Sequence, residues 1–139
     1  DRLFTTPRLW ADLRMIDGSI DPSQRQVSSC YLGDPRRANY GIYGVGTVSS
    51  LRTWLSMWSL SDSQCNAAPH LARINLPALV IDADADTGVF PSDTRAIVDA
   101  LGSEDVTLHT IEGDHYLRER DEARGEAADL IVEWIVQRS

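Results

Sequence analysis

An acidic residue and a histidine each follow a stretch of the sequence that is expected to form a β-strand. Asp86 comes soon after the apolar run 76–81, and His115 comes soon after the alternating segment 106–111. If the strands are parallel neighbours joined by a right-handed crossover, both strand ends lie at the same edge of the sheet. A carboxylate beside a histidine fixes the imidazole tautomer and makes it a general base. The spacing therefore predicts that Asp86 and His115 can approach each other.

The segments around these two residues carry the signals of a strand, helix, strand, helix unit. Residues 76–81 are continuously apolar, which is typical of a strand buried on both faces of a parallel sheet. A crossover helix is expected to begin at Pro91 and to stop at Gly102. A second strand is expected over 106–111, and an apolar stripe over 121–137 predicts a terminal helix that packs on the sheet. The fold class that follows is α/β.

From Pro77 to its end, the chain resembles the C-terminal part of an α/β-hydrolase. The features that carry the resemblance are Leu79-Val80-Ile81 followed by an acid, then a strand, the sequence Glu-Gly-Asp-His and a terminal amphipathic helix. By this resemblance Asp86 is the acid that orients the histidine, and His115 is the general base and acid. The family usually places a proline four residues after the acid, whereas Pro91 lies five residues after Asp86. Asp84 therefore stays open as the alternative acid.

The third member of a hydrolytic triad, the nucleophile, has no candidate in this sequence. A nucleophile elbow has the pattern Gly-x-Ser-x-Gly, because only small flanking residues tolerate its strained turn. Gly18-Ser19, Gly44-Val45-Gly46-Thr47 and Gly102-Ser103 all fail that pattern. The chain begins with Asp1 and not with Met, so we expect an N-terminal segment of the same hydrolase to supply the nucleophile, the oxyanion hole and the other strands. Alone, residues 1–139 are expected to be an incomplete enzyme.

The resemblance implies a serine-type hydrolase, similar to esterases, that acts on an ester, thioester or amide of a small molecule. No cofactor and no metal are expected in such a site. The competing hypothesis is a non-catalytic binding or interaction protein built on a partial or degenerate hydrolase fold, and the missing elbow is its motivation. An upstream Gly-x-Ser-x-Gly favours the enzyme.

The first 75 residues are interpreted as a helical and irregular segment, similar to the cap or lid of a hydrolase, and 76–139 as the C-terminal βαβα part of its core. Short helices are expected over 7–15 and 47–58, the second with Trp54, Met57 and Trp58 on an apolar face that either packs in a core or lines a substrate pocket. Residues 19–39 are rich in turn signals and predict an irregular excursion. The glycines of 40–46 lack a preceding strand and a P-loop lysine, which argues against a phosphate site.

Several other polar side chains have simpler interpretations than chemistry. His70 is expected on the surface, and His109 is expected to be a structural histidine within its strand. Asp82 and Asp84 stand at alternate positions, as calcium ligands can, but the rest of a calcium loop is missing. Asp82 is expected at the last position of its strand and facing solvent.

The composition of the chain limits which binding partners and which cellular compartment are expected. The formal net charge is −8, with 13 Lys and Arg against 21 Asp and Glu, and this balance argues against a nucleic-acid surface. No apolar run is long enough for a membrane span, so a cytoplasmic protein is expected. Cys30 and Cys65 are too few for a disulfide scaffold, and both are expected to be buried as small apolar residues.

Overall fold

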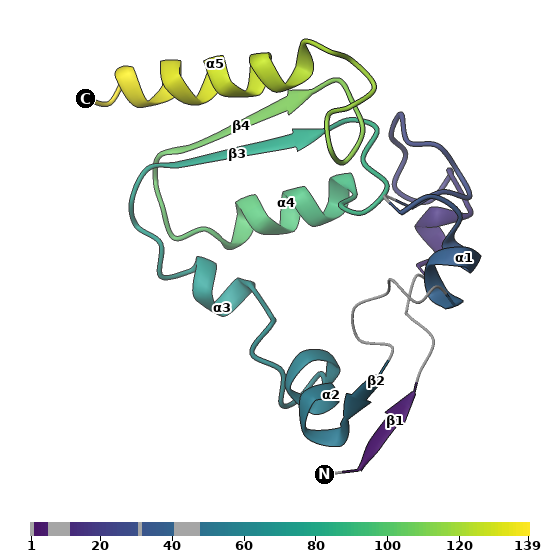
Figure 1. Ribbon diagram of the computed structural model, residues 1–139. Helices are drawn as coiled ribbons and strands as arrows, with labels where there is room; N and C mark the ends of the chain where they lie inside the picture. Colours follow the sequence, from purple (N-terminus) through teal and green to yellow (C-terminus); the bar gives the residue numbers. More distant parts are fainter. Residues whose placement is uncertain (1, 6–11, 31, 41–47) are drawn as a thin grey trace.

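The computed structural model describes residues 2–5, 12–30, 32–40 and 48–139, and it has a mixed α/β fold (Figure 1). Its C-terminal part is the unit formed by β3 (Ala78–Ala83), α4 (Pro91–Ala100), β4 (Val106–Ile111) and α5 (Ala123–Val136). All four elements of the unit were predicted, and the predictions are confirmed with shifts of one or two residues at most ends. A continuous apolar run for β3, an alternating pattern for β4 and helical periodicity for α4 and α5 account for that success.

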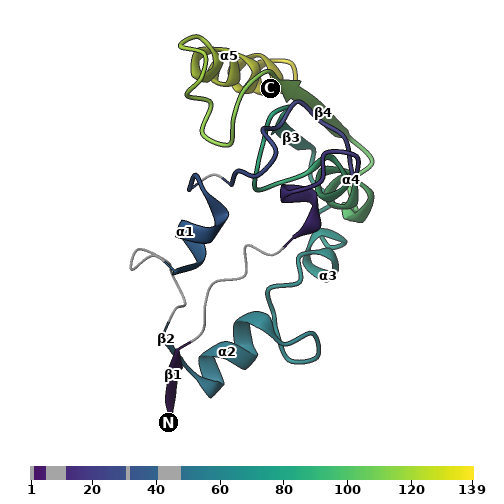
Figure 2. The ribbon, with the colours of Figure 1, turned by 90° about the vertical axis from the view of Figure 1, so that its right-hand side faces the viewer.

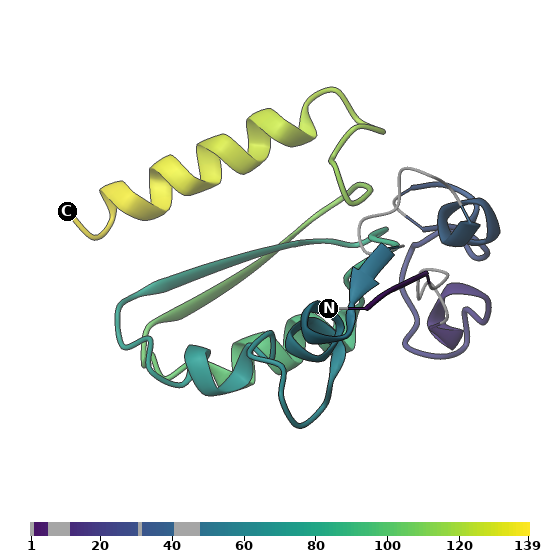
Figure 3. The ribbon, with the colours of Figure 1, turned by 60° about the horizontal axis from the view of Figure 1, so that its bottom comes forward.

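The two strands of this unit pair in parallel from Ala78 opposite Val106 to Ala83 opposite Ile111. Figures 1 and 3 show α4 on one face of the two-stranded sheet and α5 on the other. The indole Nε1 of Trp134 in α5 donates a hydrogen bond to Thr107 Oγ1 in β4 over 3.0 Å. The chain therefore leaves β3, crosses through α4 and returns in β4, so the ends of both strands lie at one edge.

The N-terminal half forms a separate two-stranded sheet. β1 (Leu3–Thr5) and β2 (Val48–Ser50) pair antiparallel, and α2 (Leu51–Trp58) follows β2 directly. Figure 2 shows these three elements at the end of the molecule away from β3 and β4. The predicted helix over 47–58 is wrong in its first turn, because Val48–Ser50 is paired as a strand. Ser50 then caps the helix by accepting a hydrogen bond from the Thr53 N–H over 3.1 Å.

The tryptophan-bearing helix α2 has no buried residue, so within the part of the chain that the structure describes its apolar face packs in no core. Met57 and Trp58 are exposed, and Trp54 is partly buried. The short helix α3 (Ala68–Leu71) follows, and His70 is exposed there as predicted.

The irregular excursion predicted over 19–39 is confirmed only in its first part. The helix α1 (Pro35–Tyr40) ends it, with the Asp34 carboxylate accepting a hydrogen bond from the Arg36 N–H over 2.8 Å. An N-cap aspartate followed by proline was a readable start signal for this helix. Of the helix predicted over 7–15, only the 3₁₀ turn η1 (Leu13–Met15) lies within the described residues, and the glycines of 41–46 lie outside them.

A small apolar cluster joins the N-terminal segment to the strand–helix unit. It contains Met15, Cys30, Ala38 and Phe90. The prediction that Cys30 is buried is confirmed, whereas Cys65 is exposed and that prediction is wrong. No helix in the described part of the chain has the length and apolar character needed to cross a membrane.

Candidate functional site

Asp86 and His115 meet at the edge of the sheet where β3 and β4 end. Nδ1 of His115 lies 3.0 Å from Oδ1 and 2.9 Å from Oδ2 of Asp86. The aspartate side chain is 11% exposed and the histidine side chain 28% exposed. The topology that the sequence predicted thus brings the two residues together, with the carboxylate in place to hold the imidazole in its Nδ1–H tautomer.

The loop after β3 folds around the Asp86 carboxylate. The N–H of Asp86 donates to the carbonyl of Ala83, the last residue of the strand, over 3.2 Å. The N–H groups of Gly88 and Val89 then donate to Asp86 Oδ1 over 2.7 and 3.0 Å. Two backbone donors on one oxygen orient the carboxylate, so the local turn contributes to its position.

His115 stands in a tight loop that the backbone of Gly113 makes possible. Gly113 has a φ of +154°, and a Cβ at this position would lie 3.2 Å from the side chain of Leu117. Asp114 stabilises the next turn, because its Oδ1 accepts a hydrogen bond from the Arg118 N–H. The ring of Tyr116 packs edge-on against the imidazole at a centroid distance of 4.9 Å.

Asp84, the alternative acid, has a different role in the structure. Its Oδ1 accepts a hydrogen bond from the Gly113 N–H over 3.0 Å, while the Ala85 N–H donates to the Gly113 carbonyl over 3.0 Å. These two bonds tie the loop after β3 to the loop after β4. Asp84 therefore holds the two loops together, and Asp86 contacts the histidine.

Two cavities adjoin His115. A polar one of about 210 Å³ lies between the irregular N-terminal segment and the two loops, and it is lined by Gln24, Gln26, Ser29, Cys30, Ala85, Thr87, Asp114, His115 and Glu119. A more apolar one of about 350 Å³ lies towards α4, and it is lined by Val80, Ile81, Asp82, Ala83, Asp86, Val89, Thr94, Ile97, His115 and Leu117. The pair of Asp86 and His115 thus lies between a polar cavity and a more apolar cavity.

A backbone hydrogen bond attaches the segment 24–30, which lines the polar cavity, to the loop after β3. The N–H of Gln24 donates to the carbonyl of Asp84 over 2.9 Å. Cys30 is buried beside this cavity, and its burial raises the pKa of the thiol. The two glutamines of this wall were missed by sequence reasoning, because neither carries a local signal.

The position of Asp82 differs from the predicted one. It lies inside β3, opposite Thr110, and is partly buried, so it neither ends the strand nor faces open solvent. Its Oδ1 is buried and has no hydrogen-bond partner among the described residues. No group of three His, Cys, Asp or Glu residues in the described ranges is arranged to hold a metal ion.

Comparisons of the chain with protein-family models, with curated proteins and with solved structures returned no match.

Proposed function

We propose that this chain supplies the acid and the base of a serine-type α/β-hydrolase that acts on an ester, thioester or amide of a small molecule. The observation that supports this most is the contact of both Asp86 carboxylate oxygens with His115 Nδ1 at the ends of neighbouring parallel strands. In a hydrolytic triad the carboxylate fixes the tautomer and stabilises the imidazolium that forms during the reaction. The positions of Asp86 and His115 suit these roles.

In this mechanism Nε2 of His115 takes the hydroxyl proton as the nucleophile attacks the carbonyl carbon of the substrate. The imidazolium then returns that proton to the leaving group, and an acyl-enzyme is formed. In the second half-reaction water takes the place of the nucleophile. It gives a proton to Nε2 of His115, attacks the acyl-enzyme and releases the acid, and the imidazolium returns the proton to the nucleophile. Asp86 stays ionised throughout and pairs with the charged imidazole.

An N-terminal segment that carries the nucleophile and the oxyanion hole is part of the proposal. Within the described residues β3 pairs with β4 alone, so one edge of β3 carries no strand. Leu76, just before β3, is 75% exposed, and Leu108 in β4 is 45% exposed. Strands of parallel sheets are normally covered on both faces, and open edges are protected. Further strands from an N-terminal segment would satisfy both requirements, with 1–75 as a cap and 76–139 as the end of the core.

The lining of the polar cavity favours neutral or cationic substrates. It contains the carboxyl groups of Asp114 and Glu119 and neither Arg nor Lys among its described lining residues. An anionic substrate would meet like charges here without a compensating cation.

The expected location of such an enzyme is the cytoplasm.

The proposal is tested by labelling the complete protein with a fluorophosphonate and mapping the modified peptide. We expect one labelled serine, in an upstream Gly-x-Ser-x-Gly, and loss of labelling when that serine is replaced by alanine. A complete reading frame without Ser, Cys or Asp at an elbow would count against the enzyme.

The second candidate is a non-catalytic binding protein, and the missing elbow in the sequence favours it. The cavities beside His115 would then bind a small molecule without turnover. The same labelling experiment separates the two, because a binding protein gives no fluorophosphonate adduct while its ligands still perturb the His115 resonances.

A further inference from the structure

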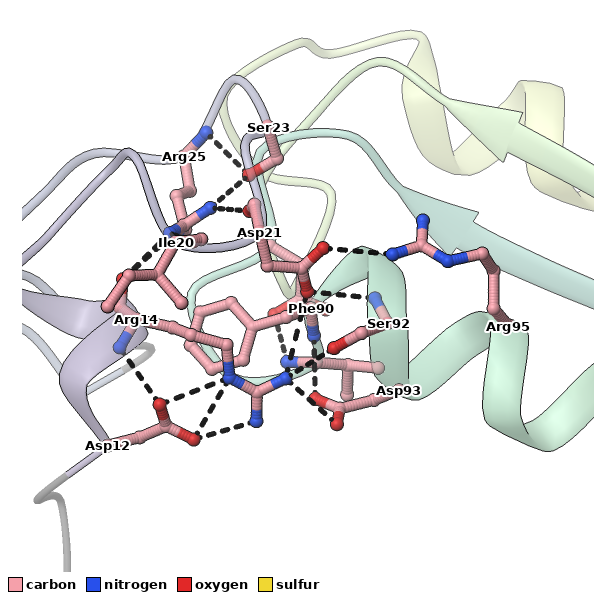
Figure 4. A network of polar contacts seen from close by, with 12 residues as sticks. Asp12, Arg14, Ile20, Asp21, Ser23, Arg25, Phe90, Ser92, Asp93 and Arg95 are labelled. Atoms are coloured by element: carbon pink, nitrogen blue, oxygen red, sulfur yellow. Dashed lines mark hydrogen bonds and ion pairs between the residues drawn. The ribbon is translucent and has the colours of Figure 1, made fainter.

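Phe90, the residue that follows the Asp86 loop, is covered by two arginines from the N-terminal segment. Its side chain is only 2% exposed. The guanidinium carbon of Arg14 lies 4.2 Å from the centroid of the Phe90 ring, and that of Arg25 lies 5.0 Å from it (Figure 4). A guanidinium over an aromatic ring is attracted by the negative face of the π system. The ring is thus fixed by charge as well as by burial.

Arg14 also binds the first turn of α4. Its Nη1 donates to Ser92 Oγ over 2.7 Å and to Asp93 Oδ1 over 3.0 Å. Its Nε and Nη2 hold the Asp12 carboxylate, so the planar guanidinium is oriented from both sides (Figure 4). One side chain therefore connects η1 to the start of α4, the helix that follows the loop 84–90. This loop carries Asp86 and is called the acid loop below.

Arg25 fixes the segment that presents Arg14. It is 5% exposed, and its Nε and Nη2 donate to the carbonyl of Arg14 over 3.0 and 2.8 Å. Its Nη2 also donates to the carbonyl of Ile20 over 2.7 Å. Asp21 completes the attachment by accepting a hydrogen bond from the Ser92 N–H over 2.8 Å. The segment around Arg14 is therefore rigidly supported.

These contacts converge on the end of the acid loop. The loop begins at β3, where Asp86 donates to the Ala83 carbonyl, and it ends at Phe90, whose N–H donates to Asp93 Oδ2 over 3.0 Å. Between these ends the carboxylate of Asp86 depends on the N–H groups of Gly88 and Val89. A shift of Phe90 would therefore move the donors that aim the carboxylate at His115.

We propose that Arg14 and Phe90 are positioning residues, which hold the loop so that the Asp86 carboxylate meets Nδ1 of His115. The inference rests on the proposed function for its catalytic meaning, because the positioned groups are the proposed acid and base. The hydrogen bond itself is measurable without turnover. Failure of the inference is therefore distinguishable from failure of the hydrolase assignment.

The test uses the ¹⁵N-labelled complete protein and the ring-nitrogen signals of its histidines at alkaline pH. In the unmodified chain we expect His115, assigned by comparison with His115→Gln, to show a protonated Nδ1. Arg14→Gln and Phe90→Leu are expected to shift His115 towards the Nε2–H tautomer with loss of the Nδ1–H signal. Arg52→Gln is the matched control, since Arg52 is exposed in α2 and takes part in none of the contacts described above.

Folding of each variant is checked by circular dichroism. A folded Arg14→Gln chain that keeps the Nδ1–H signal of His115 unchanged would overturn the proposal. If one variant does not fold, the other decides in the same way. Unfolding of both would also overturn it, because the cluster would then stabilise the whole chain and would not specifically position the acid.

Discussion

Both carboxylate oxygens of Asp86 contact Nδ1 of His115, although 29 positions separate the two residues in the sequence. Asp84, only two positions away, instead accepts a hydrogen bond from the Gly113 N–H. The two acids therefore have separable roles. One orients the histidine, and the other joins the loops that carry the pair.

We expect Asp86→Asn in the complete protein to lower kcat by on the order of 10⁴-fold, because an amide stabilises the wrong histidine tautomer and does not balance the imidazolium charge. Asp84→Asn should cost less than about 10-fold, since the amide oxygen can still accept the hydrogen bond from Gly113. Steady-state kinetics on an activated ester measures both. A larger loss at Asp84 than at Asp86 would reverse the assignment.

The ion pair of Asp12 with Arg14 predicts a stability loss in acid. The hydrogen bonds from Arg14 hold the pKa of the Asp12 carboxyl below its usual value of 3.8. A carboxyl whose pKa is lower in the folded state contributes stability above its unfolded pKa, about 3.9. That contribution is lost as the pH falls through the folded pKa. Urea unfolding between pH 5 and pH 2 should show a smaller pH dependence for Asp12→Asn than for the unmodified chain.

Equal pH dependence in the two chains would contradict this prediction. Asp17→Asn is a useful control, because the hydrogen bonds to the Asp17 carboxylate come from Ser19 and not from an arginine. It should leave the contribution of the Asp12–Arg14 pair intact.

The two cysteines should differ sharply in reactivity. Cys65 is exposed, whereas Cys30 is 3% exposed and its burial raises the pKa of its thiol. Because the thiolate is the reactive form, we expect one fast and one slow reaction with Ellman's reagent in the folded chain. Cys65→Ser should remove the fast phase, and Cys30→Ser should leave it. Two fast phases would mean that Cys30 is not buried in solution.

The strand–helix unit was predictable because its signals are local. The apolar run before Asp82, the Pro91 start and the Gly102 stop each identify an element without knowledge of its neighbours. The approach of Asp86 and His115 followed from the parallel pairing expected of two strands joined by a helix, because the ends of such strands lie at one edge of the sheet. Such topological constraints hold whatever the surrounding side chains are.

Other features depend on contacts that the sequence does not display. The pairing of Leu3–Thr5 with Val48–Ser50 joins two short segments that are distant in the chain, and neither is long enough to show a strand pattern. The choice between Asp84 and Asp86 depended on a turn that closes around one carboxylate. The exposure of Cys65 depends on which neighbours pack against it, and residue type gives only an average tendency.

The central claim is that His115 is the general base of a hydrolase, and kcat of the complete protein on an activated ester tests it most directly. We predict that His115→Ala lowers kcat by on the order of 10³-fold or more with the fold retained, because the side chain lies at a cavity edge. His70→Ala, a change at an exposed histidine in α3, should leave kcat unaltered. Unchanged turnover in a folded His115→Ala protein would contradict the account.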